Sequence, residues 1–152
     1  MQGLLQAINN LFQGNAALQA IFPGYNNADA TPACTCNFWW ADELPENAPF
    51  PYCVGSVVVG NTEALYGGLN NYGASDNTIR FTIYGSTLNT VMTAAEAMCN
   101  VFNSVLPTMP SGQSLTNVYQ KSDVTPAFEG KDKIVGNVFR ADVLYDYAPA
   151  TP

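Results

Sequence analysis

The side chains that could carry chemistry in this 152-residue chain are four cysteines and twelve carboxylates, and the sequence has no histidine. Without histidine, the commonest general base and the usual activator of a serine or cysteine nucleophile are missing. The sequence also contains no glycine-rich phosphate loop and no G-x-S-x-G nucleophile turn. We therefore expect a protein that is not an enzyme, with no catalytic residues and no cofactor.

The cysteines are Cys34, Cys36, Cys53 and Cys99. A zinc site usually needs two close ligand pairs, whereas only Cys34 and Cys36 are close in sequence. The spacing therefore predicts no metal site, and it favours small buried or half-buried thiols. A disulfide between Cys36 and Cys53 is the alternative, although a cytosolic chain gives no reason to expect it.

The densest acidic cluster consists of Asp42, Glu43 and Glu46. Paired carboxylates can hydrolyse glycosides when a fold holds them at a fixed separation. Here they lie in a proline-rich stretch, which favours a solvated loop over a catalytic pair.

Composition points to a protein partner. The formal net charge is −7 and charged residues make up 11% of the chain, against roughly 25% in an average protein. A weakly charged surface is easier to desolvate against a neighbouring subunit. Five basic residues cannot form the stripe that nucleic acids or anionic membranes require. These are Arg80, Lys121, Lys131, Lys133 and Arg140.

No stretch approaches the roughly 18 apolar residues that span a bilayer, and the first residues lack the basic start of a signal peptide. The default expectation is a product made in the cytoplasm.

Two helices are predicted at the start of the chain. Apolar residues at helical spacing indicate an amphipathic helix over residues 2–13. Asn15 is a typical cap for a short second helix that Pro23 and Gly24 terminate. The stripe of the first helix contains Leu4, Leu5, Ile8, Leu11 and Phe12.

Strands are predicted over residues 52–59, 78–84, 115–121 and 134–147, and a long helix over 87–106. The helix face is expected to contain Leu88, Val91, Met92, Ala95, Cys99, Phe102 and Leu106. The last strand is expected to hold Val135, Phe139, Ala141, Val143, Tyr145 and Tyr147 on one face. Phe81, Phe102 and Phe139 should be buried together between sheet and helix.

With a short strand at residues 38–40, the order is α-α-β-β-β-α-β-β. Short links fit an α+β fold, an antiparallel sheet with the helices packed on one face. Residues 1–147 should form a single domain, followed by a proline-containing tail at 148–152.

Phe38, Trp39 and Trp40 include both tryptophans of the chain. In a short strand, Phe38 and Trp40 fall on one face and Trp39 on the other. One face should join the core, and the other would then expose a large aromatic unless a partner covers it. Both an interface and a plain core role remain open for these residues.

Residues 60–77 separate two predicted strands and are rich in aromatic and apolar side chains. We interpret this segment as a hairpin arm that becomes ordered on a partner; the alternative is a local β-extension packed on its own domain. The candidate contact residues are Leu65, Tyr66, Leu69 and Tyr72.

The pattern resembles the tail terminator, or tail-completion, proteins of long-tailed bacteriophages. Four features fit this family: the opening helices, a Pro-Tyr-aliphatic entry into a strand, a strand that runs into an alanine-rich helix, and the closing strand. The matching stretches are residues 4–8, 15–18, 49–54, 79–86 and 138–143.

The resemblance implies a ring, typically of six subunits, at the head-proximal end of the tail tube. Such a ring would end tube growth and contact the tail tube protein and the head-tail connector proteins. DNA would pass through it without specific binding, past loop carboxylates for which Asp42, Glu43 and Glu46 are the candidates. The protein would be made in the host cytoplasm and would reside in the virion.

Two alternatives stay open. One is another neck, connector or tail-tube subunit of the virion. The other is a small ligand-binding or enzymatic α+β domain, which a deep pocket with convergent buried polar groups would support.

Overall fold

The computed structural model describes residues 2–26, 34–46, 48–65, 72–109, 113–120, 125–128 and 134–147, with side chains described for 3–26, 34–46, 48–57 and 79–109. Three helices and six strands occur in these residues. They follow the order α1 (Gln2–Gly14), α2 (Ala16–Ile21), β1 (Phe38–Trp40), β2 (Tyr52–Leu65), β3 (Tyr72–Gly85), α3 (Leu88–Ser104), β4 (Gln113–Gln120), β5 (Thr125–Phe128) and β6 (Ile134–Tyr147).

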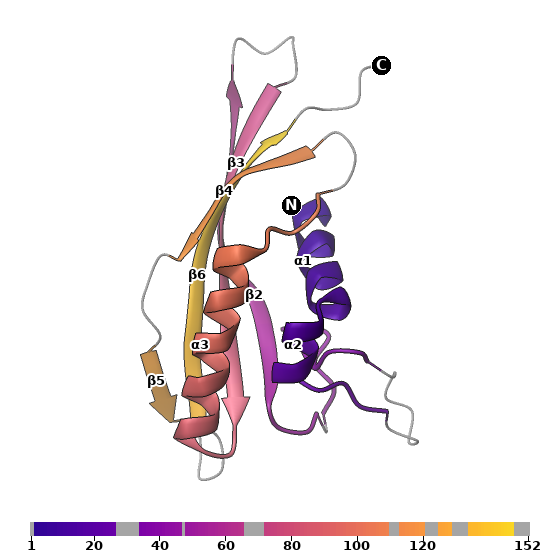
Figure 1. Ribbon diagram of the computed structural model, residues 1–152. Coiled ribbons are helices and arrows are strands. Elements are labelled where there is room, and N and C mark those ends of the chain that lie inside the picture. Colours follow the sequence, from indigo (N-terminus) through magenta and orange to yellow (C-terminus); the bar gives the residue numbers. More distant parts are fainter. Residues whose placement is uncertain are drawn as a thin grey trace.

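The helices lie together on one face of the sheet (Figure 1). The strand order is β1-β2-β3-β6-β4, and β5 pairs with β6. The predicted α+β class and the predicted order of helices and strands are therefore confirmed. No helix within the described ranges is both long and apolar enough to cross a membrane.

Two details of the predicted sheet are wrong. The sheet is mixed, because β1 runs parallel to β2, with Phe38 opposite Cys53 and Trp40 opposite Gly55. The connection between them carries the chain back along the sheet before β2 begins. In addition, β5 is a strand that the sequence pattern did not indicate, and it is only four residues long.

A bulge interrupts the pairing of β3 with β6. Phe81 pairs with Phe139, but the next residue, Thr82, pairs with Asn137, so β6 has one extra residue. Val135 therefore lies opposite Tyr84. Because side chains alternate along a strand, Phe81 and Tyr84 belong to opposite faces. The bulge thus places Val135 and Phe139 opposite β3 residues of different faces. Their own side chains lie outside the described set, so the shared face stays a prediction.

The first two helices form as the cap of α2 and the helical spacing of α1 predict. The Asn15 side chain accepts a hydrogen bond from the Leu18 backbone N–H at 3.1 Å, which satisfies one free donor at the start of α2. In α1, Leu4, Ile8 and Phe12 are buried on one side, as the helical spacing predicts.

Helix α3 begins after Thr87, whose hydroxyl accepts a hydrogen bond from the Thr90 backbone N–H at 3.2 Å. Its buried face differs in part from the prediction, because Ala94 and Met98 are buried while Leu88 is 41% exposed. The helix ends at Ser104, two residues before Leu106, which is 56% exposed. The buried stripe is therefore centred on Ala95 and Phe102, and both terminal leucines lie outside it.

The core is an aromatic cluster between the sheet and the helices. The Phe12 and Phe38 rings stack with centroids 3.9 Å apart. Phe81 and Phe102 lie 5.2 Å apart and are 1% and 4% exposed. The predicted burial of these two residues is confirmed. Phe139 is opposite Phe81 in the register, and its side chain lies outside the described set.

The β2–β3 hairpin is longer than predicted. Its strands stay paired from Tyr52 opposite Tyr84 to Leu65 opposite Tyr72. Residues 60–65 and 72–77, which the sequence left between strands, thus continue the ladder. In Figure 1 this end of the hairpin extends past the ends of α1 and α3. Tyr66 and Leu69 lie outside the described residues.

Candidate functional site: a tryptophan cleft at the β1 edge

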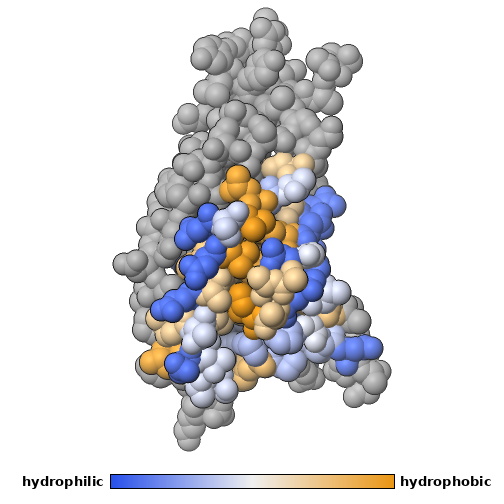
Figure 2. Space-filling model, viewed as in Figure 1, coloured by the Kyte–Doolittle hydropathy of each residue, from blue (hydrophilic) through white to orange (hydrophobic). Residues whose placement is uncertain are grey.

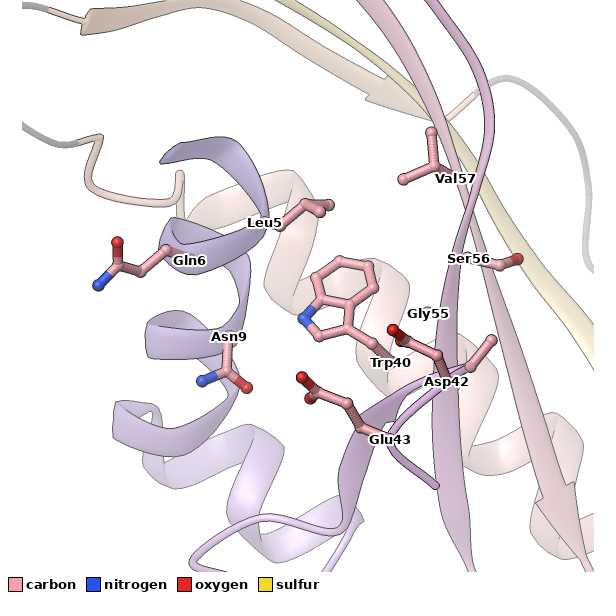
Figure 3. Close-up of a pocket in the computed structure, with 10 residues that line it drawn as sticks. Leu5, Gln6, Asn9, Trp40, Asp42, Glu43, Gly55, Ser56 and Val57 are labelled. Carbon is pink, nitrogen blue, oxygen red and sulfur yellow. The ribbon is translucent and has the colours of Figure 1, made fainter. Parts of the chain in front are cut away.

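An open cleft of about 660 Å³ lies between α1 and the β1–β2 pair. Helix α1 contributes Leu5, Gln6 and Asn9, and β2 contributes its residues 55–57. Trp40 and the turn that follows it complete the lining. The cleft therefore joins three segments that are distant in sequence, at the edge of the sheet formed by β1 (Figure 3).

Trp40 projects into this cleft from the end of β1 (Figure 3). Its ring meets Phe38 edge to face, with centroids 5.2 Å apart and planes at 77°. Gly55 makes this position possible, since a Cβ there would come within 2.7 Å of Trp40 Cζ3. The indole is half-buried, so it has core contacts on one side and the cleft on the other.

Asp42 and Glu43 place two exposed carboxylates beside the indole. The turn that carries them is held by main-chain hydrogen bonds. The Ala41 N–H donates to the Gly55 carbonyl at 3.1 Å, and the Glu43 N–H donates to the Trp40 carbonyl at 2.9 Å. The hydrogen bond from Ala41 to the backbone of β2 thus helps to fix the turn that carries the two carboxylates.

Asn37 anchors the other side of β1. It is 1% exposed, and its Nδ2 donates to the carbonyls of Pro49 at 2.7 Å and Pro51 at 3.1 Å. Its Oδ1 accepts from the Trp39 indole N–H at 2.9 Å. This buried amide ties the proline-rich loop to β1 and holds Trp39 on the face opposite Trp40.

The cleft offers groups for binding. Its lining residues supply two carboxylates, two amides, a serine hydroxyl and an aromatic ring, but no cation. Across the described residues, no group of three His, Cys, Asp or Glu side chains is placed to hold a metal ion. The arrangement suits a positively charged partner group that can also lie against an indole.

The described thiols are free. Cys36 and Cys53 are fully buried, Cys99 is nearly so, and Cys34 is half-buried, as the sequence favoured. Burial raises the pKa of Cys36 to about 12 and that of Cys99 to about 11. Burial also raises the pKa of Cys53 well above its ordinary value. The alternative of a Cys36–Cys53 disulfide is wrong for this structure.

The residues predicted to contact a partner differ in their burial. Phe38 is 1% exposed and stacks on Phe12, so its proposed interface role is wrong because the core already covers it. Trp39 and Trp40 are half-buried on opposite faces of β1. Leu65 and Tyr72 pair at the end of the hairpin, and their contacts with a partner stay a prediction.

Of the three acidic candidates, Asp42 and Glu43 line the cleft, whereas Glu46 is exposed and outside its lining. The sequence analysis missed Leu5, Asn9 and Gly55 as parts of one site. The available signal was Gly55, because a glycine inside a strand often marks close approach of another group.

Comparison with known proteins finds no family model and no curated protein that matches this chain.

Proposed function

We propose that this chain is a structural virion protein of a long-tailed bacteriophage. In this proposal it forms a ring, typically of six subunits, at the head-proximal end of the tail tube. The ring ends tube growth and joins the tail to the head-tail connector. The protein is made in the host cytoplasm and works in the virion without a cofactor.

The β2–β3 hairpin is the observation that carries the proposal. Both strands have 14 residues, and their far ends extend past α1 and α3 (Figure 1). Beyond Gly55, where its pairing with β1 ends, β2 is an edge of the described sheet, and the backbone groups of such an edge can pair with a neighbouring subunit. The segments that resemble tail terminators also occupy matching elements: residues 4–8 lie in α1, 79–85 in β3 and 138–143 in β6.

Assembly of the purified protein tests the proposal. We expect native mass spectrometry and electron microscopy to show a closed ring. In this ring, one surface of each subunit should contact a different surface of the next subunit. Added to growing tail tubes, the protein should stop elongation and be found at tube ends. A chain that stays monomeric at high concentration and also in the assembled particle would overturn the proposal.

The same experiment distinguishes a tail terminator from the nearest alternative, which is another neck, connector or tube subunit. A tube subunit would be incorporated along the tube, and a connector subunit would bind the head without stopping tube growth. Only capping of tube ends supports the terminator function.

The Trp40 cleft favours a second candidate of a different class, a small ligand-binding domain. Its volume of about 660 Å³ lies within the range of small-molecule sites, which is roughly 300–1,000 Å³. Such sites bury most of their ligand, and this cleft is open with exposed carboxylates at its rim. Saturable binding of a small cation by the monomer, with no assembly, would favour this candidate.

A further inference from the structure

We infer that the open edges of β2 and β4 pair with each other between neighbouring copies of this chain, so that the sheets of adjacent subunits join into one continuous sheet. The inference rests on the proposed ring, which it deepens by naming the two surfaces that meet. The β2 edge is defined here as residues 57–64, and the β4 edge as residues 113–120.

The two edges belong to the same rows of the sheet. Two rows that cross all four strands β2, β3, β6 and β4 mark their ends. The first row contains, in order, Ala64, Gly73, Tyr147 and Gln113. The second row contains Val57, Ile79, Ala141 and Gln120. These strands therefore form a four-stranded block whose two edges begin and end together, and the outer end of this block extends past α1 and α3 (Figure 1).

Both edges of the block are open in the part of the chain that the structure describes. The pairing of β1 with β2 ends at Gly55, and β4 pairs with β6 alone. An open edge presents a row of backbone N–H and C=O groups that another strand can pair with. The block thus offers two edges for hydrogen bonding, one on each side.

The residues of these edges provide little of the usual protection against pairing. Proteins commonly protect an edge with charged side chains, proline or a very short strand. The eight residues of β4 include no charged residue and no proline, and the β2 edge has Glu63 as its single charge and no proline. By contrast, β1 has three residues, and β5 has four and contains Pro126.

Each edge strand has one bulge, at Val58 in β2 and at Thr116 in β4. A bulge can twist an edge away from a partner. Bulges also bend a sheet, and they are a means by which sheets curve and close. Without added charge or proline, the two bulges fit a block that curves around a ring axis.

Strand direction favours a second copy as the occupant of each edge. Every pair of neighbours in the block is antiparallel, so β2 and β4 run in opposite directions. When rotation about an axis roughly along the strands relates two copies, β4 of one copy lies antiparallel to β2 of the next. This contact joins different surfaces of the two copies, and its repetition generates a ring when the rotation closes. A foreign peptide would need only one such edge.

Asn61 and Asn117 allow a test by charge, because one row joins them through Asp76 and Leu144. Within one chain, three strand spacings of about 4.8 Å put their backbones roughly 14 Å apart. This separation exceeds the screening length of about 8 Å at physiological salt. Charges added at the two positions therefore interact mainly between copies.

The repelling variant carries Asn61→Lys and Asn117→Lys, and the attracting variant carries Asn61→Lys and Asn117→Glu. The control carries Asn100→Lys and Asn103→Lys, at two exposed positions of α3. Circular dichroism and thermal melting verify that each variant folds, and sedimentation velocity measures its assembly at low and high salt.

We expect the apparent dissociation constant of assembly to be at least about fivefold higher for the repelling variant than for the attracting variant, because like charges directly opposite destabilise a strand pair. The attracting variant and the control should assemble as the wild type does. High salt should reduce the difference between the two edge variants. A contact between identical edges would place the two copies of Asn61→Lys together, so both edge variants would fail alike. Equal assembly of the two edge variants at low salt would overturn the pairing of β2 with β4.

Hydrogen exchange supplies a second readout on the wild-type chain. On assembly, amides of 57–64 and 113–120 should slow more than those of 141–147, which already have a paired strand on both sides. A ring that forms with unchanged exchange along both edges would overturn the inference but not the proposed ring. A wild-type chain that never assembles would overturn both.

Discussion

Single side chains in this protein act mainly through ring packing. Phe12 stacks on Phe38 at 3.9 Å and lies 5.8 Å from Phe102, while Phe102 lies 5.2 Å from Phe81. These rings come from α1, β1, β3 and α3, so each one joins elements that are distant in sequence. Removing one ring should therefore loosen contacts across the whole core.

Phe102→Ala should reduce the free energy of unfolding by about 3–5 kcal/mol, the usual effect of emptying a large aromatic site. Urea denaturation followed by circular dichroism measures the change. Phe50→Ala is the matched control, since Phe50 is 39% exposed and stacks on Tyr52 outside the buried core cluster. A loss below about 1 kcal/mol for Phe102→Ala would contradict the packing described for α3.

The thiols differ in reactivity for a related reason. Because the thiolate is the nucleophile, a raised pKa and burial both protect a cysteine from alkylation. The folded state keeps Cys36 and Cys99 neutral until the pH approaches their pKa values of about 12 and about 11. Burial of these neutral thiols therefore leaves the free energy of unfolding unchanged below their ordinary pKa of 9.0. As the pH rises above that value, the thiols ionise in the unfolded chain first, and the free energy of unfolding falls.

Iodoacetamide at about pH 8 should modify Cys34 in the native protein and all four cysteines in denaturant. Mass spectrometry counts the modified sites, and Cys34→Ser should leave the native protein unmodified. Rapid native labelling of Cys36, just before β1, or of Cys53, in β2, would show that the paired strands β1 and β2 open far more often than the burial of these thiols indicates.

At the scale of elements, the β2–β3 hairpin has two parts. Residues 52–57 and 79–84 carry or border the core, whereas residues 60–65 and 72–77 continue the pairing beyond the helices. The β3 half of this outer part also pairs with β6, from Gly73 opposite Tyr147 to Asn77 opposite Val143. We expect the core beneath the helices to stay folded when the outer part is removed, because the pairs of β3 with β6 from Ile79 to Gly85 are kept. This division makes the hairpin a natural candidate for contacts between subunits.

Replacing residues 62–75 with an Asn-Gly turn would join Asn61 to its partner Asp76 through the shortest favourable hairpin loop. We expect a folded chain that no longer assembles, as measured by circular dichroism and sedimentation velocity. The control replaces only residues 66–71 with Asn-Gly and keeps both paired strands.

Hydrogen exchange gives an independent measurement on the unmodified subunit. Amides of 60–65 and 72–77 should exchange faster than those of 52–57 and 79–84, and should slow on assembly. Equal protection of the two parts in the free subunit, or normal assembly of the shortened chain, would contradict the role given to the arm.

At the scale of the whole molecule, the proposed ring would be strongly acidic. Six copies with a formal charge of −7 each would carry −42. A duplex passing through such a ring would meet repulsion, screened beyond about 8 Å at physiological salt. A basic bore would instead bind phosphates by releasing counterions and would hold the duplex in place.

The isolated protein should show no measurable affinity for duplex DNA at about 150 mM salt. Fluorescence anisotropy with a labelled duplex measures this, with a basic DNA-binding protein as the positive control. Tight, salt-sensitive binding, or a bore lined by the five basic residues, would contradict the proposed passage of DNA. The basic residues are Arg80, Lys121, Lys131, Lys133 and Arg140.

The sequence by itself determined the local features of this protein. Helical spacing located α1 and α3, Asn15 marked the start of α2, and Phe81 and Phe102 were expected in one core. These features follow from neighbouring residues, because caps and periodicity act within a few positions along the chain.

Only the tertiary structure decided which distant segments meet. The parallel pairing of β1 with β2, the bulge in β6 and the burial of Phe38 all depend on register and on packing across the sheet. The Trp40 cleft depends on the same features, since Gly55 lies under the indole only when it pairs opposite Trp40. Local propensity does not specify such pairings, because they are fixed by how complete side-chain faces fit together.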